Sequence, residues 1–166
     1  MLHASVSVEP PMFVDVVNVT SAADMADVVK SKAAEQDIII MTAAVADFCP
    51  SHPADEKIKK NDSSYESVIE LERTEDILSY LGAHKAKGQL ICGFSMETQN
   101  MLENSKAKLA KKNADMIVAN NLKVAGAGFG TDTNVVTLIT ADDCTELEIM
   151  DKSCVAARIM DRLLQM

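Results

Sequence analysis

Lysine residues are concentrated in two short windows of an otherwise acidic sequence. Seven of the sixteen Lys and Arg residues lie in Lys57–Lys60 and Lys106–Lys112, and neither window contains an acidic residue. Lys108 and Lys112 are four residues apart, so on a helix their ammonium groups project from one face and repel each other weakly. A polyanion bound between them would relieve this repulsion. The alternative is a solvated loop and a solvated helix face, the ordinary setting of lysine.

A run of small residues ending in a carboxylate follows the most apolar segment of the chain. Thr42 to Asp47 reads Thr-Ala-Ala-Val-Ala-Asp and leaves the predicted strand Asp37–Ala43 at its carboxyl end. Small side chains there let a ligand approach the backbone, and Asp47 is able to accept hydrogen bonds or face a cation. A tight strand exit with a capping Asp explains the same spacing equally well.

Two glycine-containing segments are further candidates for ligand contacts. Phe94 follows Gly93 at the end of the predicted strand Leu90–Phe94, where an aromatic ring would be able to stack on a nucleobase. An aromatic residue at a strand end belongs more often to the core. Gly126 to Gly130 resembles a phosphate-binding loop but leads toward a strand instead of opening a helix, so we interpret it as a flexible turn.

The histidines and cysteines show no pattern typical of metal binding or covalent catalysis. His3, His52 and His84 have no partner at suitable spacing, and no G-x-S-x-G motif is present. The four cysteines form no metal-type pair and are typical of free thiols in a reducing cytosol: Cys49, Cys92, Cys144 and Cys154. We therefore expect a cytoplasmic location and no covalent catalysis.

Length and charge restrict the class of protein further. The chain has 166 residues, of which 48% are hydrophobic, so one domain spanning 1–166 is expected. The formal charge of −9 argues against binding to nucleic acid, which requires a surplus of basic residues. The longest apolar stretch, Ile38–Ala46, is far shorter than the ~20 residues of a membrane helix.

Strands and helices alternate along the chain. Thr20 and Ser21 are candidates to cap the first helix, and the unbroken apolar run in Asp37–Ala43 predicts a central parallel strand covered on both faces. Leu102 and Leu109 are expected to pack. The predicted elements are strands Phe13–Val19, Asp37–Ala43, Val68–Glu72, Leu90–Phe94 and Met116–Ala119, a hairpin of Val135–Thr140 with Glu146–Met150, helices Ala22–Glu35, Thr74–Leu81 (closed by Gly82) and Gln99–Lys112, and a final helix with Val155, Ile159 and Leu163 on one face.

This order predicts an α/β fold with a mainly parallel sheet, helices on both faces and an antiparallel hairpin near the C-terminus. Ligands of such sheets bind beyond the carboxyl ends of the strands. The segment Val45–Ser64 contains two prolines and seven charges, too polar to be buried, which indicates a long surface excursion.

Five motifs occur in an order that resembles the synthetase part of bacterial phosphopantothenoylcysteine synthetase, also called phosphopantothenate–cysteine ligase. The resemblance covers nearly the whole chain, although the family's glycine-rich opening strand and its Asn-containing segment for phosphopantothenate have no counterpart, so we expect an N-terminally truncated domain. The motifs are Ala43-Ala44-Val45-Ala46-Asp47, Lys57-Ile58-Lys59-Lys60, Gly93-Phe94 with Glu97-Thr98, Lys108 with Lys111-Lys112-Asn113, and Ala119-Asn120.

The resemblance implies a three-layer, Rossmann-like (ribokinase-like) fold, a homodimer, and possible fusion or pairing with a flavin-dependent decarboxylase, with no flavin in this chain. It implies CTP as the nucleotide, with Mg²⁺ facing Asp47, and a mobile flap over residues 48–64 whose Lys57 is catalytic. The nucleotide contacts that it implies are Met41, Thr42, Ala43, Asp47, Lys57, Glu75, Asp76, Ile77, Leu78, Phe94, Lys108 and Lys112.

The implied reaction activates the carboxylate of 4'-phosphopantothenate with CTP as an acyl-cytidylate, which the amine of cysteine then attacks. Charge that builds on the phosphates would be stabilised by lysines and Mg²⁺, and a closed flap would keep water from the mixed anhydride. Two alternatives remain at this level: a non-catalytic fragment that serves dimerisation, and an unrelated α/β enzyme of the nucleotide-sugar or kinase type.

Overall fold

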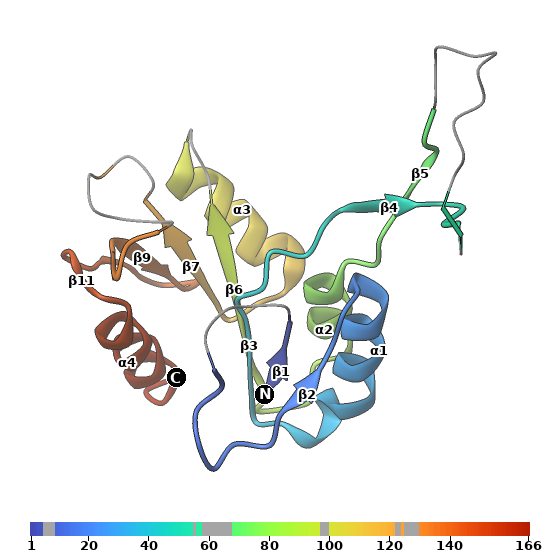
Figure 1. The fold of residues 1–166 in the computed structure, drawn as a ribbon. Helices are drawn as coiled ribbons and strands as arrows, with labels where there is room; N and C mark the ends of the chain where they lie inside the picture. Colours follow the sequence, from blue (N-terminus) through green and yellow to red (C-terminus); the bar gives the residue numbers. More distant parts are fainter. Residues whose placement is uncertain (5–8, 55, 58–67, 97–99, 122–123, 125–129) are drawn as a thin grey trace. The chain divides into compact units, whose positions relative to one another are not determined.

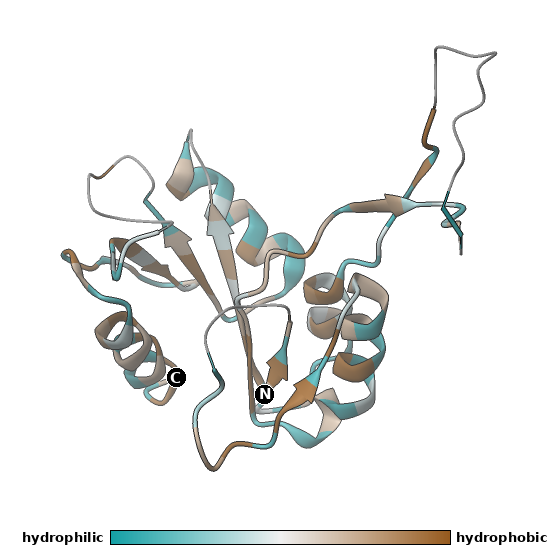
Figure 2. Cartoon of the chain, in the orientation of Figure 1, coloured by the Kyte–Doolittle hydropathy of each residue, from teal (hydrophilic) through white to brown (hydrophobic). Residues whose placement is uncertain are grey.

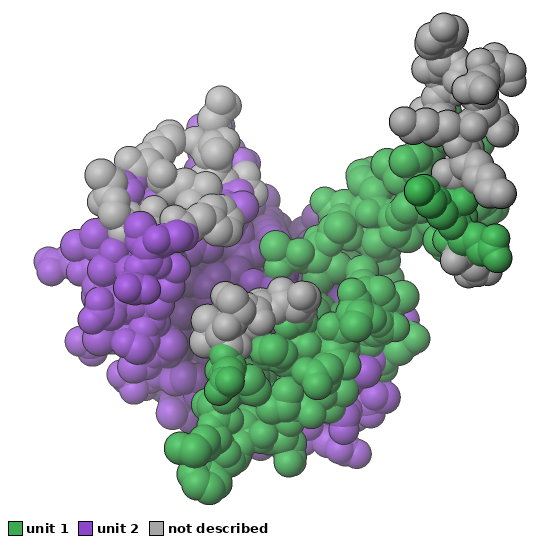
Figure 3. Space-filling view, viewed as in Figure 1, with its two compact units in different colours: residues 1–27, 44–76 green, residues 28–43, 77–166 purple. Residues whose placement is uncertain are grey.

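The computed structural model describes residues 1–4, 9–54, 56–57, 68–96, 100–121, 124 and 130–166 (Figure 1). The chain divides into two compact units, shown in green and purple in Figure 3. Unit 1 comprises Met1–Asp27 and Ala44–Asp76, and unit 2 comprises Val28–Ala43 and Ile77–Met166. The expectation of a single domain stays a prediction.

Unit 2 is built on a five-stranded sheet in the order β10-β9-β7-β6-β3. Strands β3, β6 and β7 are parallel to one another, whereas β9 is antiparallel to both β7 and β10. The bounds are β3 Ile38–Met41, β6 Leu90–Met96, β7 Met116–Asn120, β9 Val136–Ile139 and β10 Cys144–Glu146.

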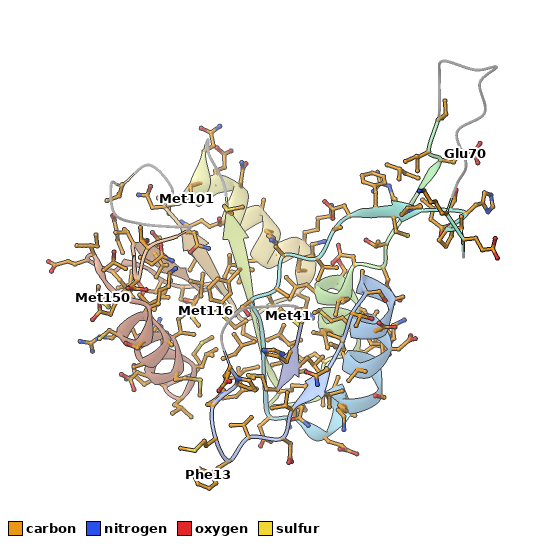
Figure 4. The ribbon with its side chains drawn as sticks, viewed as in Figure 1. Phe13, Met41, Glu70, Met101, Met116 and Met150 are labelled. Carbon is orange, nitrogen blue, oxygen red and sulfur yellow. The ribbon has the colours of Figure 1, made fainter. Side chains whose placement is uncertain are left out.

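Helices cover both faces of this sheet, as predicted. Helices α2 (Ile77–His84) and α3 (Met101–Lys112) pack together on one face. On the other face α4 (Lys152–Leu163) joins the core, because its buried residues Val155, Ile159 and Leu163 cluster with Met116 and Val118 of β7. The hydrophobic colouring of β7 and β9 in Figure 2 marks this core, and Met116, labelled in Figure 4, is fully buried. The predicted α/β class is confirmed.

The position predicted for the most apolar strand was wrong. Within the described part of the chain, β3 pairs with β6 alone, so it is the last strand of its sheet instead of a central one. Its four residues are half-buried. An apolar run reports what covers the faces of a strand, and it carries no information about how many neighbours the strand has in the hydrogen-bonding direction.

The second helix begins and ends later in the sequence than predicted. It begins at Ile77 instead of Thr74, and it continues through Gly82 to His84. Thr74 is held instead by residues 46 and 47 of the same chain. Its N–H donates to the Asp47 carbonyl at 3.0 Å, and its hydroxyl donates to the Ala46 carbonyl. Gly82 is therefore not a helix cap but an interior residue.

The C-terminal hairpin was predicted correctly, but not its register. The Thr140 N–H donates to the Asp143 carbonyl (2.9 Å) and the Asp143 N–H to Oγ1 of Thr140 (3.1 Å), which closes a tight turn. This turn starts the second strand at Cys144, earlier than the predicted Glu146–Met150. Met150 instead begins β11 (Met150–Asp151), which pairs with β8 (Thr133–Asn134).

The start of the chain forms less strand than predicted. Only Val17–Asn18 (β2) of the expected strand Phe13–Val19 is paired, with Leu2–His3 (β1) in parallel. Phe13 has a φ of 65° and is fully exposed, and Figure 4 shows its ring pointing outward. The left-handed backbone at Phe13 breaks the extended conformation that its apolar neighbours suggest.

Helix α1 (Ala22–Lys32) and the 3₁₀ turn η1 (Ala33–Glu35) confirm the first predicted helix. Its start carries a reciprocal cap: the Asp24 N–H donates to Ser21 Oγ (3.1 Å), and the Ser21 N–H donates to Oδ2 of Asp24 (3.0 Å). Hydrogen bonds with Thr20 and Ser21 lower the pKa of the Asp24 carboxyl, the largest effect coming from the Thr20 hydroxyl.

Part of the polar excursion forms one strand of a short antiparallel pair that was not predicted. Strand β4 (Phe48–Pro50) pairs with β5 (Leu71–Arg73), which replaces the predicted strand Val68–Glu72. Residues 55 and 58–64 of this excursion, and residues 65–67 after it, lie outside the described residues. None of the described helices is long and apolar enough to cross a membrane.

Candidate functional site

The predicted nucleotide contacts are divided between the two units. Eight of them belong to unit 2 and four to unit 1. Unit 2 carries Met41, Thr42, Ala43, Ile77, Leu78, Phe94, Lys108 and Lys112, and unit 1 carries Asp47, Lys57, Glu75 and Asp76. The convergence of both sets on one ligand stays a prediction.

The carboxyl ends of three parallel strands form one edge of the unit 2 sheet. Met41 is in register with Gly93, and β6 runs on alongside β7 to the pair Met96 and Asn120. Met41 is half-buried at the end of β3, where Figure 4 labels it, and Thr42 and Ala43 after it are exposed. This is the edge at which sheets of this type bind ligands.

The structure separates the four lysines of α3 into two kinds. Lys106 and Lys111 are exposed, whereas Lys108 and Lys112 are half-buried on the side that faces the sheet and α2. Nζ of Lys108 donates to the Phe94 carbonyl at 2.7 Å, and Nζ of Lys112 donates to Ser79 Oγ at 3.0 Å. Of the pair singled out by spacing, Lys108 thus borders the end of β6, whereas Lys112 contacts α2.

Gly93 allows α2 to lie close to the sheet. A Cβ at this position would lie 2.6 Å from Cδ2 of Leu78 and 3.1 Å from Cδ1 of Ile117. Two of the predicted contacts, Leu78 and the backbone around Gly93, are therefore side by side. Ile77, another predicted contact, is buried at the start of α2, so its side chain is part of the core.

Phe94 is oriented differently from the lysines. Its side chain is half-buried and packs against the core cluster that contains Cys92 and the α4 residues. Alternation along β6 gives the opposite face to Gly93 and Ser95, which contact α2 and α3. Only the backbone carbonyl of Phe94 meets Lys108, and the stacking of its ring on a nucleobase stays a prediction.

Polar residues outside the predicted nucleotide contacts lie at the same strand ends. The hydroxyls of Ser95 and Ser105 are 2.7 Å apart and both are buried. Nδ2 of Asn120 donates to the Ser95 carbonyl (3.4 Å), and Nδ2 of Asn134 donates to Oδ1 of Asn120 (2.8 Å). Ser105 precedes Lys108 by three residues, so helical spacing was the available signal that they share a face.

In unit 1, Asp47 is placed by the β4–β5 pair. It precedes β4, and its carbonyl accepts from the N–H of Thr74, which follows β5. Asp47, Glu75, Asp76 and Lys57 are all exposed. No group of three or more His, Cys, Asp or Glu side chains that could hold a metal ion exists among the residues described.

Some candidate residues lie outside the described residues. These are Ile58, Lys59 and Lys60, Glu97 and Thr98, and the glycine segment from Gly126 through Phe129. Residues 55 and 58–64 of the predicted flap also lie outside the described residues.

Cys92 lies next to Gly93 but is not suited to nucleophilic chemistry. It is fully buried in the core cluster, and burial, with a smaller contribution from the Asp115 carboxylate, raises the pKa of its thiol to about 12. A thiol must be deprotonated to react. Cys144 and Cys154 are exposed.

Parallel strands with helices on both faces, and two half-buried lysines on the helix after β6, define a Rossmann-like α/β domain. The chain belongs to the family described as the DNA/pantothenate metabolism flavoprotein C-terminal domain, whose model matches residues 1–166. An unrelated α/β enzyme of the nucleotide-sugar or kinase type is thereby excluded.

Named relatives agree with this family. The coenzyme A biosynthesis bifunctional protein CoaBC of Bacillus subtilis (strain 168) is 44% identical over 165 residues, which cover 98% of this chain and 40% of the relative. The chain therefore spans about two fifths of the length of this relative. The crystal structure of a CoaBC C-terminal domain matches with a TM-score of 0.79 and 39% identity, covering 99% of this chain and 73% of that one.

A more distant solved structure shares the fold alone. It is a Cab2 variant in complex with phosphopantothenate-cysteine, with a TM-score of 0.64 and 17% identity, covering 90% of this chain and 53% of that chain.

Proposed function

We propose that this chain supplies the nucleotide-binding part of a phosphopantothenate–cysteine ligase. The enzyme would use CTP to activate 4'-phosphopantothenate as an acyl-cytidylate and would then form the amide with cysteine. Membership of the family and 44% identity to a coenzyme A biosynthesis protein support the reaction. The observation that carries the binding role is the half-buried pair Lys108 and Lys112, of which Lys108 borders the end of β6 and Lys112 contacts α2.

The two lysines are suited to a triphosphate. Each ammonium has three N–H donors, and the Phe94 carbonyl occupies one of those of Lys108. Phosphate oxygens would accept from others while the carbonyl keeps the ammonium at the strand edge. Negative charge that builds on the α-phosphate during attack by the carboxylate would be stabilised at this position, in surroundings less polar than water.

Asp47 and Lys57 complete the proposal in unit 1. The exposed Asp47 carboxylate fits one bond to Mg²⁺, which usually takes one or two carboxylates together with phosphate oxygens. The ion would neutralise phosphate charge when bound. We infer that Lys57 acts in turnover of the acyl-cytidylate, and that Glu75 and Asp76 contact the nucleotide. The support for these roles is the resemblance of their motifs to the family.

Calorimetric titration of the 166-residue chain with CTP and with ATP, each with Mg²⁺, tests the proposal. We expect CTP to bind more tightly than ATP. A chain that binds neither nucleotide, or prefers ATP, would contradict the CTP assignment. Release of CMP and pyrophosphate on addition of 4'-phosphopantothenate and cysteine then tests the complete reaction.

The competing proposal is a non-catalytic fragment that serves dimerisation. Exposed apolar side chains of the β4–β5 region favour it, since Phe48, Leu71 and Val68 are 51%, 59% and 86% exposed. Nucleotide binding would decide against this alternative. A homodimer that also binds CTP fits both observations, and light scattering would measure its mass. Pairing with a decarboxylase is a further proposal, supported by the bifunctional relative.

A further inference from the structure

A buried hydrogen bond between two serines joins α3 to β6. The Oγ atoms of Ser95 and Ser105 are 2.7 Å apart, and the two residues are 4% and 0% exposed. Buried polar groups need partners because water cannot reach them. Each hydroxyl therefore fixes the other, and the distance between the helix and the strand is set by a directional contact at this point.

This contact lies next to the one made by Lys108. Ser95 follows Phe94 on β6, and Ser105 lies three residues before Lys108 on the same face of α3. Two consecutive residues of the strand are thus bound by two residues of one helix face: Ser105 bonds to the Ser95 hydroxyl and Lys108 to the Phe94 carbonyl. A shift of α3 along the strand would break both contacts.

The strand end is fixed from its other side as well. Nδ2 of Asn120 donates to the Ser95 carbonyl, and Oδ1 of Asn120 accepts from Asn134, whose own Oδ1 accepts from the N–H of Val135. The hydroxyl pair therefore joins α3 to a strand end that Asn120 of β7 holds in place, and Asn120 is itself held by Asn134 of β8.

We propose that Ser95 and Ser105 are positioning residues that hold α3 at the register where the Lys108 ammonium meets the nucleotide phosphates. The inference rests on the proposed function, and it adds two residues that act through Lys108 without touching the ligand. Alanine at either position leaves the other hydroxyl buried without its partner. The helix then loses its directional contact, and Lys108 loses its fixed position.

A double-mutant cycle with CTP titration tests this role. Ser105→Ala is expected to weaken CTP binding about 5-fold, a coupling within the usual range for contacting residues. In a Lys108→Ala background the same substitution should have no further effect. In a Lys106→Ala background the 5-fold loss should remain in full, because Lys106 is exposed on the other side of the helix. Ser95→Ala should repeat this pattern from the strand side.

The outcomes distinguish a failure of the proposed function from a failure of the positioning role. Absence of CTP binding by the wild-type chain would overturn the proposed function and this inference with it. Suppose that the wild type binds CTP and that Lys108→Ala weakens binding. The positioning role alone is then overturned by either of two results: a serine variant that binds CTP as tightly as the wild type, or a serine substitution that weakens binding as much in the Lys108→Ala background as in the wild type. Thermal unfolding of each variant ensures that titrations are made on folded protein, and Ser95→Ala serves if Ser105→Ala does not fold.

Discussion

The carbonyl oxygen of Lys112 lies 1.8 Å from the position that a Cβ on Gly82 would occupy. The backbones of α2 and α3 therefore touch at the end of α3. Nδ2 of Asn113 donates to the Gly82 carbonyl at 2.7 Å and reinforces the contact. The glycine that sequence reasoning took for a helix end is instead what allows Lys112 to sit against α2.

Gly82→Ala should strongly destabilise the fold. Alanine normally stabilises a helix interior relative to glycine by about 1 kcal/mol. A fall in the free energy of unfolding would therefore be opposite to the usual effect of this substitution. Because the added methyl meets a backbone atom, we expect the free energy of unfolding to fall by about 3 kcal/mol. Urea denaturation measures this.

Gly93→Ala is the matched control for that substitution. Its methyl would meet the ends of the Leu78 and Ile117 side chains, which are able to rotate away, so a smaller loss of about 1–2 kcal/mol is expected. Equal losses of unfolding free energy for the two variants would show that the backbone contact at Gly82 costs no more than the side-chain contacts at Gly93.

The lysines of α3 should differ in their effect on nucleotide affinity. Lys108→Ala and Lys112→Ala should each weaken CTP binding by about 10-fold or more, because each removes a half-buried charged donor. Lys106→Ala and Lys111→Ala change the net charge equally, but the side chains are exposed, and affinity should change less than about 2-fold. Calorimetry on the four variants measures the contrast, and four similar losses would indicate a general charge effect.

Asp47 should be required for the effect of Mg²⁺ on binding. Asp47→Asn removes the charge with little change in shape, so CTP affinity in Mg²⁺ should fall by about 3- to 10-fold while affinity in EDTA is maintained or rises. Asp27→Asn, an exposed carboxylate of the same unit outside the predicted contacts, is the control. An equal Mg²⁺ enhancement in wild type and Asp47→Asn would argue against the metal role.

Cys92 should make the protein sensitive to alkaline pH. Burial raises the pKa of its thiol from an ordinary 9.0 to about 12, so the folded state retains a proton that the unfolded state releases. This contribution to stability is complete below pH 9 and is lost as the pH rises toward 12. The unfolding free energy of the wild type should therefore fall more steeply between pH 9 and pH 11 than that of Cys92→Ala.

Cys144→Ala provides the comparison, since Cys144 is exposed and its removal should leave the slope of the wild type unchanged. Parallel slopes for wild type and Cys92→Ala would mean that the Cys92 thiol does not remain protonated in the folded protein.

Local patterns predicted most elements of unit 2. The spacing of Val155, Ile159 and Leu163 identified α4 because a helix must bury one stripe, and all three residues are buried. The run Ile38 to Met41 was recognised as a strand, but its place at the end of the sheet was not, because strand order depends on contacts between distant segments. The start of α2 was misplaced for a related reason: Thr74 bonds to Ala46 and Asp47, far away in the sequence.

The sequence by itself determined the α/β alternation, the family motifs and the candidate lysines, because periodicity and residue type are local properties. Only the tertiary structure decided which side chains face the strand edge. It separated Lys108 and Lys112 from the exposed lysines beside them, turned the ring of Phe94 toward the core, and paired Ser95 with Ser105. Such pairings arise when separate segments pack at fixed distances, which no spacing within one segment encodes.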